Sequence, residues 1–348
     1  MCNRFTVSIF AGFLCLMSSG SSAIADSKPI PLDATVKIDS QTKAVLKGAL
    51  KYLASKQRLD GSWSLGEGEM GHPVAMTGYT LLAFMVMGNL PAQGDYAKNV
   101  AAGMQFLLDS IQPDGIYRGV SSGQYMYNHG IATTALAELY GESHSPAIRP
   151  KLVRALGVII KAQNPAGGWR YTPNPNDADI SVTVIQVVAL RAAQESGLSI
   201  PQESINRAID YVHSSRNSDN GFAYQAGIGD SGFARTAAAI YSLQVLGKYD
   251  DSMVKAGSAY LLAHQQDQQF WTYANYYAAP AQYMIGGQTW RDWYALTKDK
   301  LMGFVTRNGE MAHWEPKLDP GSNGSIFATA VAVHILAMPY HLIPLYQR

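Results

Sequence analysis

The sequence predicts an all-α protein, an α/α toroid in which six helix pairs form an inner and an outer ring. Two observations carry this prediction. A turn motif of Asp, Asn and Gly followed by an aromatic residue recurs about every fifty residues, and each copy separates an amphipathic helical pattern from an apolar one. A fixed period of this size indicates supersecondary units that stack on their neighbours.

The clear copies of the motif are 57–63, 112–117, 163–169, 216–222 and 307–314. The aromatic residues at positions 63, 117, 169 and 222 are 54, 52 and 53 residues apart. The last copy ends 92 residues after position 222, which is too far for one step. We therefore expect a degenerate copy at 265–273, which keeps Phe270, Trp271 and Tyr273 but has lost the glycine. These copies make six units.

Each unit pairs an outer helix with an inner helix. The outer helices carry charges on one face, such as Lys151, Arg154 and Lys161, and are expected to face solvent. The inner helices are apolar on nearly all sides and rich in alanine, which is typical of buried helices. The expected pairs are 45–53 with 76–87, 97–108 with 131–140, 150–162 with 180–196, 201–213 with 233–246, 253–264 with 276–285, and 290–305 with 326–338.

The turn motif itself has a structural explanation. Asp-Gly and Gly-Gly pairs form the turn between an outer and an inner helix. The aromatic residue that follows is expected to fill the groove between adjacent units. We therefore expect Trp63, Trp169 and Trp314 to stabilise the fold rather than bind a ligand.

The ends of the chain predict export and a single domain. Arg4, an apolar run at 5–17 and the sequence Ala23-Ile24-Ala25 are typical of a secretory signal peptide over 1–25. The run is shorter than the roughly 20 residues that a membrane span needs, so we expect no transmembrane segment in the mature chain. Residues 26–39 are expected to form an N-terminal tail, and 40–348 one toroid domain of about six units. The expected location is periplasmic or extracellular.

Composition excludes several classes of function. Both cysteines, Cys2 and Cys15, lie in the expected signal peptide, so a mature chain has no thiol for a disulfide, a zinc site or a nucleophile. Without Arg4 the charges balance at 26 basic and 26 acidic residues, and no basic stripe indicates nucleic-acid binding. No pair of histidines has metal-binding spacing. We expect no metal and no cofactor.

These repeats resemble those of the prenyltransferase and squalene-cyclase superfamily over roughly residues 40–348. The copy at 57–63, Gln-Arg-Leu-Asp-Gly-Ser-Trp, is the most similar to the repeat of that superfamily. The resemblance implies the α/α toroid, and it is nearest to exported bacterial members with a single ring. It implies no one function, because the superfamily includes cyclases, protein prenyltransferase subunits and thioester proteins.

Departures from the family pattern narrow the function. The Cys that helps hold zinc in protein prenyltransferases is absent from the mature chain. Triterpene cyclases carry an Asp-x-Asp-Asp-Thr segment as proton donor and have a second ring. Here the nearest segment is Asp177-Ala178-Asp179-Ile180-Ser181, and there is no second ring. These differences argue against full triterpene cyclisation.

Candidate site residues follow from the expected ring. In an alternating ring all inner helices begin at one end, so their N-termini surround one cavity mouth. Asp177 and Asp179 are the candidate catalytic pair, because two close carboxylates can share a proton and keep one group as an acid. In the alternative, Asp179 merely caps a helix that begins at Ile180. The candidate ligand-binding residues are His72, Tyr127, His129, Asp230, Arg235, Tyr276, Tyr277 and His313.

Three functions remain open at this point. The first is a terpenoid-cyclase-like protein whose Asp pair performs metal-free acid catalysis on a small apolar or amphipathic, isoprenoid-like ligand. The second is a non-catalytic binding or interaction module, for which the sequence names no protein partner. The third is an enzyme acting on polysaccharides, since α/α toroids also host lyases and hydrolases. A deep apolar cavity would favour the first, a filled ring the second and an open polar groove the third.

Overall fold

The computed structural model describes residues 36–65, 71–119, 122–174, 176–266, 269–316, 324–340 and 342. The expected signal peptide at 1–25 and most of the expected tail lie outside the described residues. In the part of the chain that the structure describes, no helix is long and apolar enough to cross a membrane.

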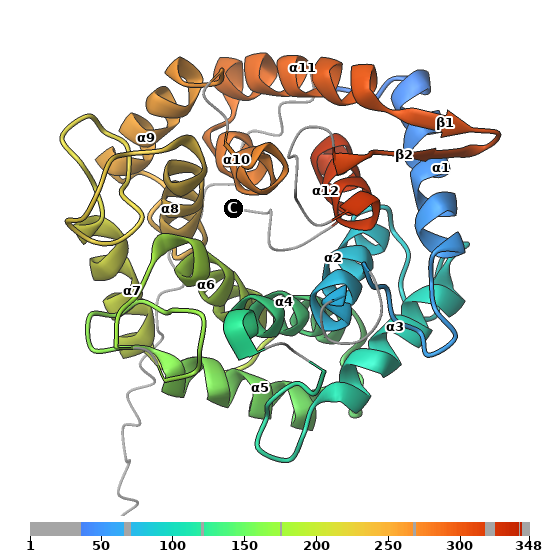
Figure 1. The fold of residues 1–348 in the computed structure, drawn as a ribbon, viewed down its shortest axis with the longest axis horizontal. Coiled ribbons are helices and arrows are strands. Elements are labelled where there is room, and N and C mark those ends of the chain that lie inside the picture. Colours follow the sequence, from blue (N-terminus) through green and yellow to red (C-terminus); the bar gives the residue numbers. More distant parts are fainter. Residues whose placement is uncertain are drawn as a thin grey trace, which may run out of the picture.

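Helices alternate between two concentric rings (Figure 1). The outer ring contains α1 (Ser40–Ser55), α3 (Ala97–Ser110), α5 (Arg149–Ala162), α7 (Gln202–Ser214), α9 (Ser252–Ala263) and α11 (Gly287–Phe304). The inner ring contains α2 (Pro73–Met85), α4 (Tyr125–Ser143), α6 (Ile180–Glu195), α8 (Phe233–Val245), α10 (Trp271–Ile285) and α12 (Gly324–Ala337). The predicted toroid of six helix pairs is confirmed.

The ring closes where the first and last described helix pairs meet. Each inner helix packs on the next, and α12 packs on α2 and α1. A small hairpin of β1 (Thr306–Asn308) and β2 (Met311–His313) adds an antiparallel pair beside α1. Short 3-10 turns, η2 (Ser122–Gln124) and η4 (Met338–Tyr340), flank α4 and α12. The core lies between the two rings and includes nearly every side chain of the inner helices.

The aromatic residue of the motif joins the outer and inner helices of its own unit. In the third unit, the Trp169 backbone nitrogen donates to Thr183 Oγ1 of α6 at 3.1 Å, and its indole nitrogen donates to the Ile159 carbonyl of α5 at 2.7 Å. Trp63 and Trp314 repeat this pattern, with indole bonds to the carbonyls of Leu53 and Leu301. All three indoles are buried. Their location agrees with the structural role expected from the sequence.

The turn that precedes the aromatic residue joins each unit to the next. Gly167 has a φ of +98°, and a Cβ there would lie 2.1 Å from the Arg207 carbonyl oxygen of α7. Glycine alone tolerates both the left-handed conformation and this approach. The Gln163 side chain donates to the carbonyls of Gly167 and of Ser204 in the next unit. One copy of the motif therefore bonds three helices: α5, α6 and α7.

Two inner helices begin more than one helical turn earlier than predicted. The pattern placed their starts at residues 131 and 276, whereas α4 begins at Tyr125 and α10 at Trp271. The added turns are rich in Tyr and Asn, which have modest helix propensity. Most of these side chains are buried near the centre of the ring, and this packing outweighs the propensity. Several expected rim residues are consequently helical.

Candidate functional site

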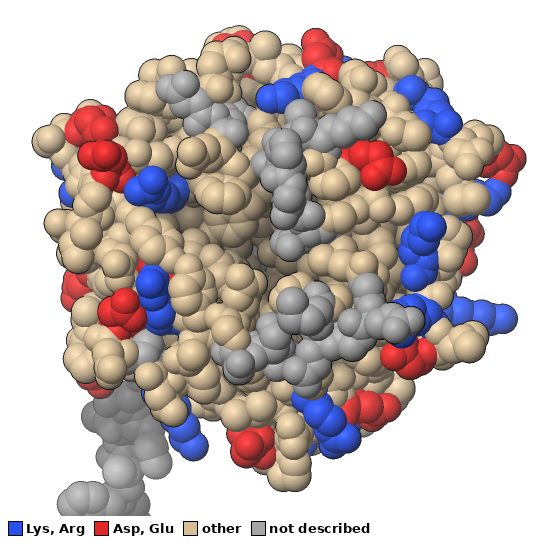
Figure 2. Space-filling view, viewed as in Figure 1, with Lys and Arg blue, Asp and Glu red and all other residues tan. Residues whose placement is uncertain are grey.

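A cavity of about 1200 Å³ opens at the N-terminal ends of the inner helices. Every inner helix contributes to its wall: His72 and Met76 from α2, Tyr127 from α4, Ser181 from α6, Arg235 from α8, Tyr273 from α10 and Phe327 from α12. Figure 2 shows the surface hollowed near the ring centre, with most charged side chains away from the hollow. The sequence-based expectation of a pocket at these helix ends matches this geometry.

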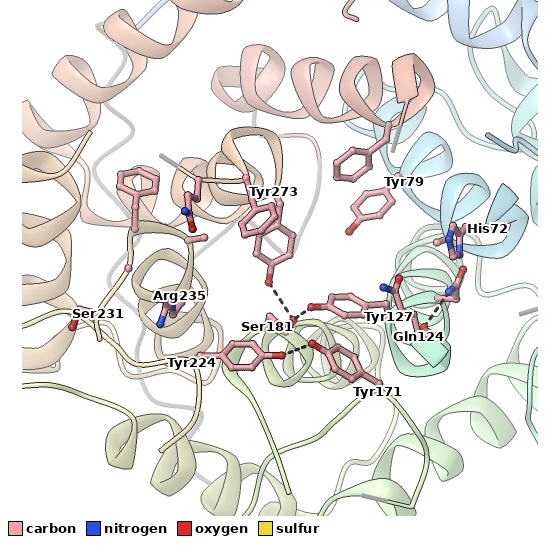
Figure 3. Close-up of a pocket in the computed structure, with 18 of the residues that line it drawn as sticks. His72, Tyr79, Gln124, Tyr127, Tyr171, Ser181, Tyr224, Ser231, Arg235 and Tyr273 are labelled. Carbon is pink, nitrogen blue, oxygen red and sulfur yellow. Dashed lines mark hydrogen bonds between the residues drawn. The ribbon is translucent and has the colours of Figure 1, made fainter. Parts of the chain in front are cut away.

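Aromatic rings and neutral polar groups dominate the wall. Its aromatic residues are Tyr79, Tyr127, Tyr171, Tyr224, Phe233, Tyr260, Phe270, Tyr273 and Phe327. Figure 3 shows Tyr79, Tyr127 and Tyr273 extending into the same space. Burial raises the pKa of the Tyr127 and Tyr273 hydroxyls well above the ordinary value, so both stay neutral. The cavity therefore offers ring faces together with uncharged hydroxyl groups.

Asp179 forms a buried polar network behind this wall. It is the N-cap of α6, and its Oδ1 accepts from the Val182 backbone nitrogen at 3.0 Å and from Ser181 Oγ at 2.5 Å. Its Oδ2 accepts from Arg170 Nη1 at 2.7 Å. The Asp179 side chain is fully buried. Ser181 in turn shares a 2.5 Å hydrogen bond with the Tyr127 hydroxyl, which connects the carboxylate to the cavity.

Asp177 has a different environment from Asp179. Its side chain is 54% exposed, and its Oδ2 lies 3.4 Å from Arg170 Nε and 3.0 Å from Gln225 Nε2. Arg170 therefore lies between the two carboxylates. The structure brings the candidate acid pair to one guanidinium, and it gives Asp179 the capping contact that the sequence left as the alternative.

Three tyrosines extend the network around Arg170. The Arg170 guanidinium lies 4.7 Å from the centre of the Tyr171 ring, and its Nη1 donates to the Tyr224 hydroxyl at 2.9 Å. The hydroxyls of Tyr171 and Tyr224 are hydrogen-bonded to each other. Tyr127 stacks on Tyr171 at 5.8 Å between ring centres. A cation over an aromatic face is attracted to it, so the guanidinium, the carboxylate of Asp179 and the tyrosines form one connected cluster beside the cavity.

The remaining candidate residues divide into two groups. His72, Tyr127 and Arg235 line the cavity, and the exposed Asp230 lies beside it, with its carbonyl accepting from Arg235 Nη1 at 2.7 Å. His72 has a left-handed backbone with φ of 48° and ψ of 48° at the N-cap of α2. Such strain is commonest where a side chain has a function.

Four candidates lie outside the cavity wall: Tyr276, Tyr277, His313 and His129. Tyr276 and Tyr277 are buried in the core of α10, where they contact Tyr79 and Tyr273. His313 stacks on Tyr52 of α1 at 4.5 Å and bonds Glu315 at 2.8 Å. The structure does not bring these side chains to the central site.

His129 is also remote from the cavity wall. It is fully buried, and its Nε2 donates to the Ala155 carbonyl of α5 at 2.9 Å while its Nδ1 accepts from the Tyr125 hydroxyl at 2.9 Å. Burial lowers its pKa to about 4, so the neutral ring joins α4 to α5. Both ring nitrogens are already used within the fold.

Sequence reasoning missed Arg170, Tyr171 and Tyr224. Tyr171 and Tyr224 each follow the aromatic residue of a motif by two positions, after Trp169 and Phe222 respectively. Both tyrosines line the cavity, so the same offset from the motif places an aromatic side chain in the wall in two units. Repetition at this offset was the available signal. In the described part of the chain, no group of three or more His, Cys, Asp or Glu could hold a metal ion.

Comparison with protein families supports the fold. Residues 154–299 match the squalene-hopene cyclase C-terminal domain family. No curated protein matches the chain as a sequence relative. The family match and the toroid together confirm the resemblance to the terpenoid-cyclase-like α/α-toroid superfamily.

Solved structures share this fold at low sequence identity. The apo type II terpene cyclase MstE of Scytonema has a TM-score of 0.57 and 15% identity, with 87% of this chain and 99% of that chain covered. The protein geranylgeranyltransferase-I of Candida albicans has a TM-score of 0.55 and 13% identity, with 88% and 93% covered. An α-1,6-mannanase of Salegentibacter sp. HEL1_6 has a TM-score of 0.65 and 7% identity, with 86% and 99% covered. At these identities the likeness concerns the fold alone.

Proposed function

We propose that this protein binds a small apolar or amphipathic, isoprenoid-like ligand in the central cavity. The observation that carries the proposal is the cavity itself, which has about 1200 Å³ of space and nine aromatic residues in its described wall. Small-molecule pockets are typically concave, mostly apolar and on the order of 300–1000 Å³. The volume of this cavity is slightly above that range, so the cavity has room for a large small-molecule ligand.

The comparisons support an apolar ligand. Structures of MstE hold geranylgeranyl dihydroxybenzoate or merosterolic acid A, and the Candida transferase structure holds geranylgeranyl diphosphate. Those ligands belong to those proteins. The present cavity lies at the centre of the ring, and it presents aromatic faces suited to an isoprenoid chain.

Binding is better supported than acid catalysis. Both oxygens of Asp179 already accept hydrogen bonds, one of them from a guanidinium, whereas an acid must present a proton to its substrate. Asp177 is exposed and lies beyond Arg170. Catalysis by this pair stays a prediction, and substitution of each carboxyl tests it.

Asn at position 179 keeps the cap but loses the charge that pairs with Arg170. We expect Asp179→Asn to lower the free energy of unfolding by about 2 kcal/mol, because hydrogen bonds to charged groups are worth about 1.5–3 kcal/mol. Asp177→Asn, at an exposed site, should cost less than about 0.5 kcal/mol. Urea denaturation measures both. If either variant instead abolished turnover of a C20 isoprenoid while unfolding like the parent, catalysis would replace simple binding.

Hydrolysis of a polysaccharide fits the site less well. Glycoside hydrolases position two carboxyl groups about 5–9.5 Å apart on either side of the scissile bond. The wall of the cavity, as far as the structure describes it, presents tyrosines, amides, two histidines and one arginine. The α-1,6-mannanase therefore shares the fold of this chain, and we do not propose glycoside hydrolysis for this chain.

Ligand binding can be tested by filling the cavity. Ala75 lines it on α2, whereas Ala259 is exposed on α9. We expect purified protein to bind geranylgeraniol, as measured by titration of intrinsic Trp fluorescence. Ala75→Trp should weaken that binding at least about tenfold, because it occupies ligand space, and Ala259→Trp should leave it unchanged. Equal affinity in all three proteins would contradict a central site.

Export is part of the proposal. Arg4, the apolar run and Ala23-Ile24-Ala25 support it, although they lie outside the described residues. Expression in a bacterium followed by fractionation and N-terminal sequencing would test it. The expected mature N-terminus is near Asp26 in the periplasmic or extracellular fraction, and an intact Met1 on cytoplasmic protein would contradict it.

A further inference from the structure

The wall of the ring differs at the fifth unit. In the other units a buried motif aromatic, such as Trp169 or Phe222, fills the groove between the outer and inner helices. Between α9 and α10 the degenerate copy has two aromatic residues: Trp271, the first residue of α10, is buried, whereas Phe270 at the N-cap is 67% exposed. There the cavity reaches outward as far as Tyr260 and His264 at the end of α9. We call this extension between α8, α9 and α10 the side branch.

Polar side chains concentrate in the side branch. Ser231 and Arg235 come from the start of α8, His264 from the end of α9, and Gln269 from the residues before α10. Figure 3 shows Arg235 and Ser231 on the side of the cavity opposite His72, beyond Tyr224. The wall near Tyr79 and Phe327 is aromatic by contrast. The cavity is therefore aromatic near Tyr79 and Phe327, and the side branch is the polar part of its wall that contains an arginine.

Arg235 sets the charge of the side branch. Among the described residues that line the cavity, it is the one with a permanent positive charge. Its Nη1 donates to the Asp230 carbonyl at 2.7 Å, and no carboxylate of a described residue lies within ion-pair distance of its guanidinium. The nearby carboxylate of Asp219 accepts from Ser231 Oγ and from the Gly221 backbone nitrogen. A half-buried guanidinium with donors to spare favours an anion beside it.

We infer that the side branch binds the acidic head group of the ligand, a carboxylate or a phosphate, while the apolar body lies in the central cavity. This inference rests on the proposed function and adds the class of ligand. Arg235 would hold the head group through charge-assisted hydrogen bonds, which are roughly twice as strong as neutral ones. Gln269 and Phe270, from the degenerate copy of the motif, line the space that the head group would occupy.

The test compares three ligands with the same C20 tail: geranylgeraniol, geranylgeranoic acid and geranylgeranyl monophosphate. The full chain is expected to bind one or both acids about 10- to 100-fold more tightly than the alcohol, the range for hydrogen bonds to a charged group. Whichever acid binds more tightly identifies the head group. Arg235→Gln should abolish this preference, whereas Arg235→Lys should keep part of it.

Control variants separate charge from folding. Arg191→Gln removes a surface arginine that pairs with Glu195 on α6, and it should preserve the preference for acids. Thermal unfolding of Arg235→Gln at the temperature of the parent protein shows that the variant keeps its fold. A preference for acids that survives in Arg235→Gln, or that is missing in the parent, overturns the inference while binding of the alcohol sustains the proposed function. Binding of none of the three overturns both.

Discussion

The third and fifth units contain the same helix pair but connect it in different ways. In the third, Trp169 bonds both α5 and α6, and Gln163 bonds the start of α7. In the fifth, Phe270 is exposed and the cavity reaches α9. Packing of apolar inner helices is therefore enough to build the ring. At the fifth unit, where the motif is degenerate, the cavity extends toward α9.

The largest expected difference concerns the aromatic residue of each connection. Trp169→Ala should lower the free energy of unfolding by about 3–5 kcal/mol, because it leaves a cavity and an unpaired Ile159 carbonyl. Phe270→Ala removes an exposed ring and should change it by less than about 0.5 kcal/mol. Urea denaturation of both variants measures the contrast. Equal shifts would mean that the two aromatic residues contribute alike to stability.

Acid should destabilise the packing around His129, which contacts the motif aromatic Tyr117 of the second unit. Burial lowers the pKa of His129 to about 4 from an ordinary 6.5, and the motif aromatic Tyr117 packs edge-on against its ring. The unfolded chain binds the proton first, so stability is full above pH 6.5 and falls between pH 6.5 and about 4. The loss for this group is about 3 kcal/mol.

Substitution isolates that contribution. In His129→Gln the free energy of unfolding should be lower at pH 7, and its decline between pH 6.5 and 4 should be shallower than in the parent. His334, whose pKa burial lowers to about 3, supplies a second slope in the same direction. Removing both histidines should flatten the curve further. An unchanged slope in His129→Gln would show that this ring takes up its proton without unfolding.

The smallest expected effect concerns the motif glycine, which adopts a left-handed backbone and also lies close to a carbonyl of the next unit. Gly167 and Gly197 have φ values of +98° and +85°, but only Gly167 lies against a neighbouring carbonyl. Gly197→Ala should cost about 1 kcal/mol for the left-handed conformation alone. Gly167→Ala should cost about 2–3 kcal/mol, since α7 must also move. Thermal unfolding would resolve the pair, and equal costs would show that the contact with α7 yields freely.

Much of the ring could be predicted from the sequence, because its period and its apolar helices are local patterns. The degenerate fifth copy was also visible at Phe270 and Trp271. The extension of the cavity toward α9 could not be predicted, because it depends on how side chains of three helices pack in space. The starts of α4 and α10 were missed for a related reason: their tyrosines are helical only because the ring buries them.

The candidate site was predicted in part. The expectation that helix N-termini surround a pocket located His72, Tyr127 and Arg235 in its wall. It also selected His129 and Tyr277, which lie at the right helix ends but face the core, and rotation about a helix axis is hard to infer in helices that are apolar all round. The role of Arg170 required two loops to approach each other, which no local pattern reveals.

Ring closure has a consequence for the order of folding. The Tyr52 hydroxyl bonds Ser325 Oγ at 2.7 Å across 273 residues of sequence, and Lys298 bonds Asp39 at 3.1 Å across 259. A chain emerges N-terminus first from a ribosome and from an export channel alike, so the first outer helix must wait for the last inner helix before its inward face is covered. The emerging chain is therefore an open arc until its last helix has appeared. Its central cavity is the last feature of the molecule to exist.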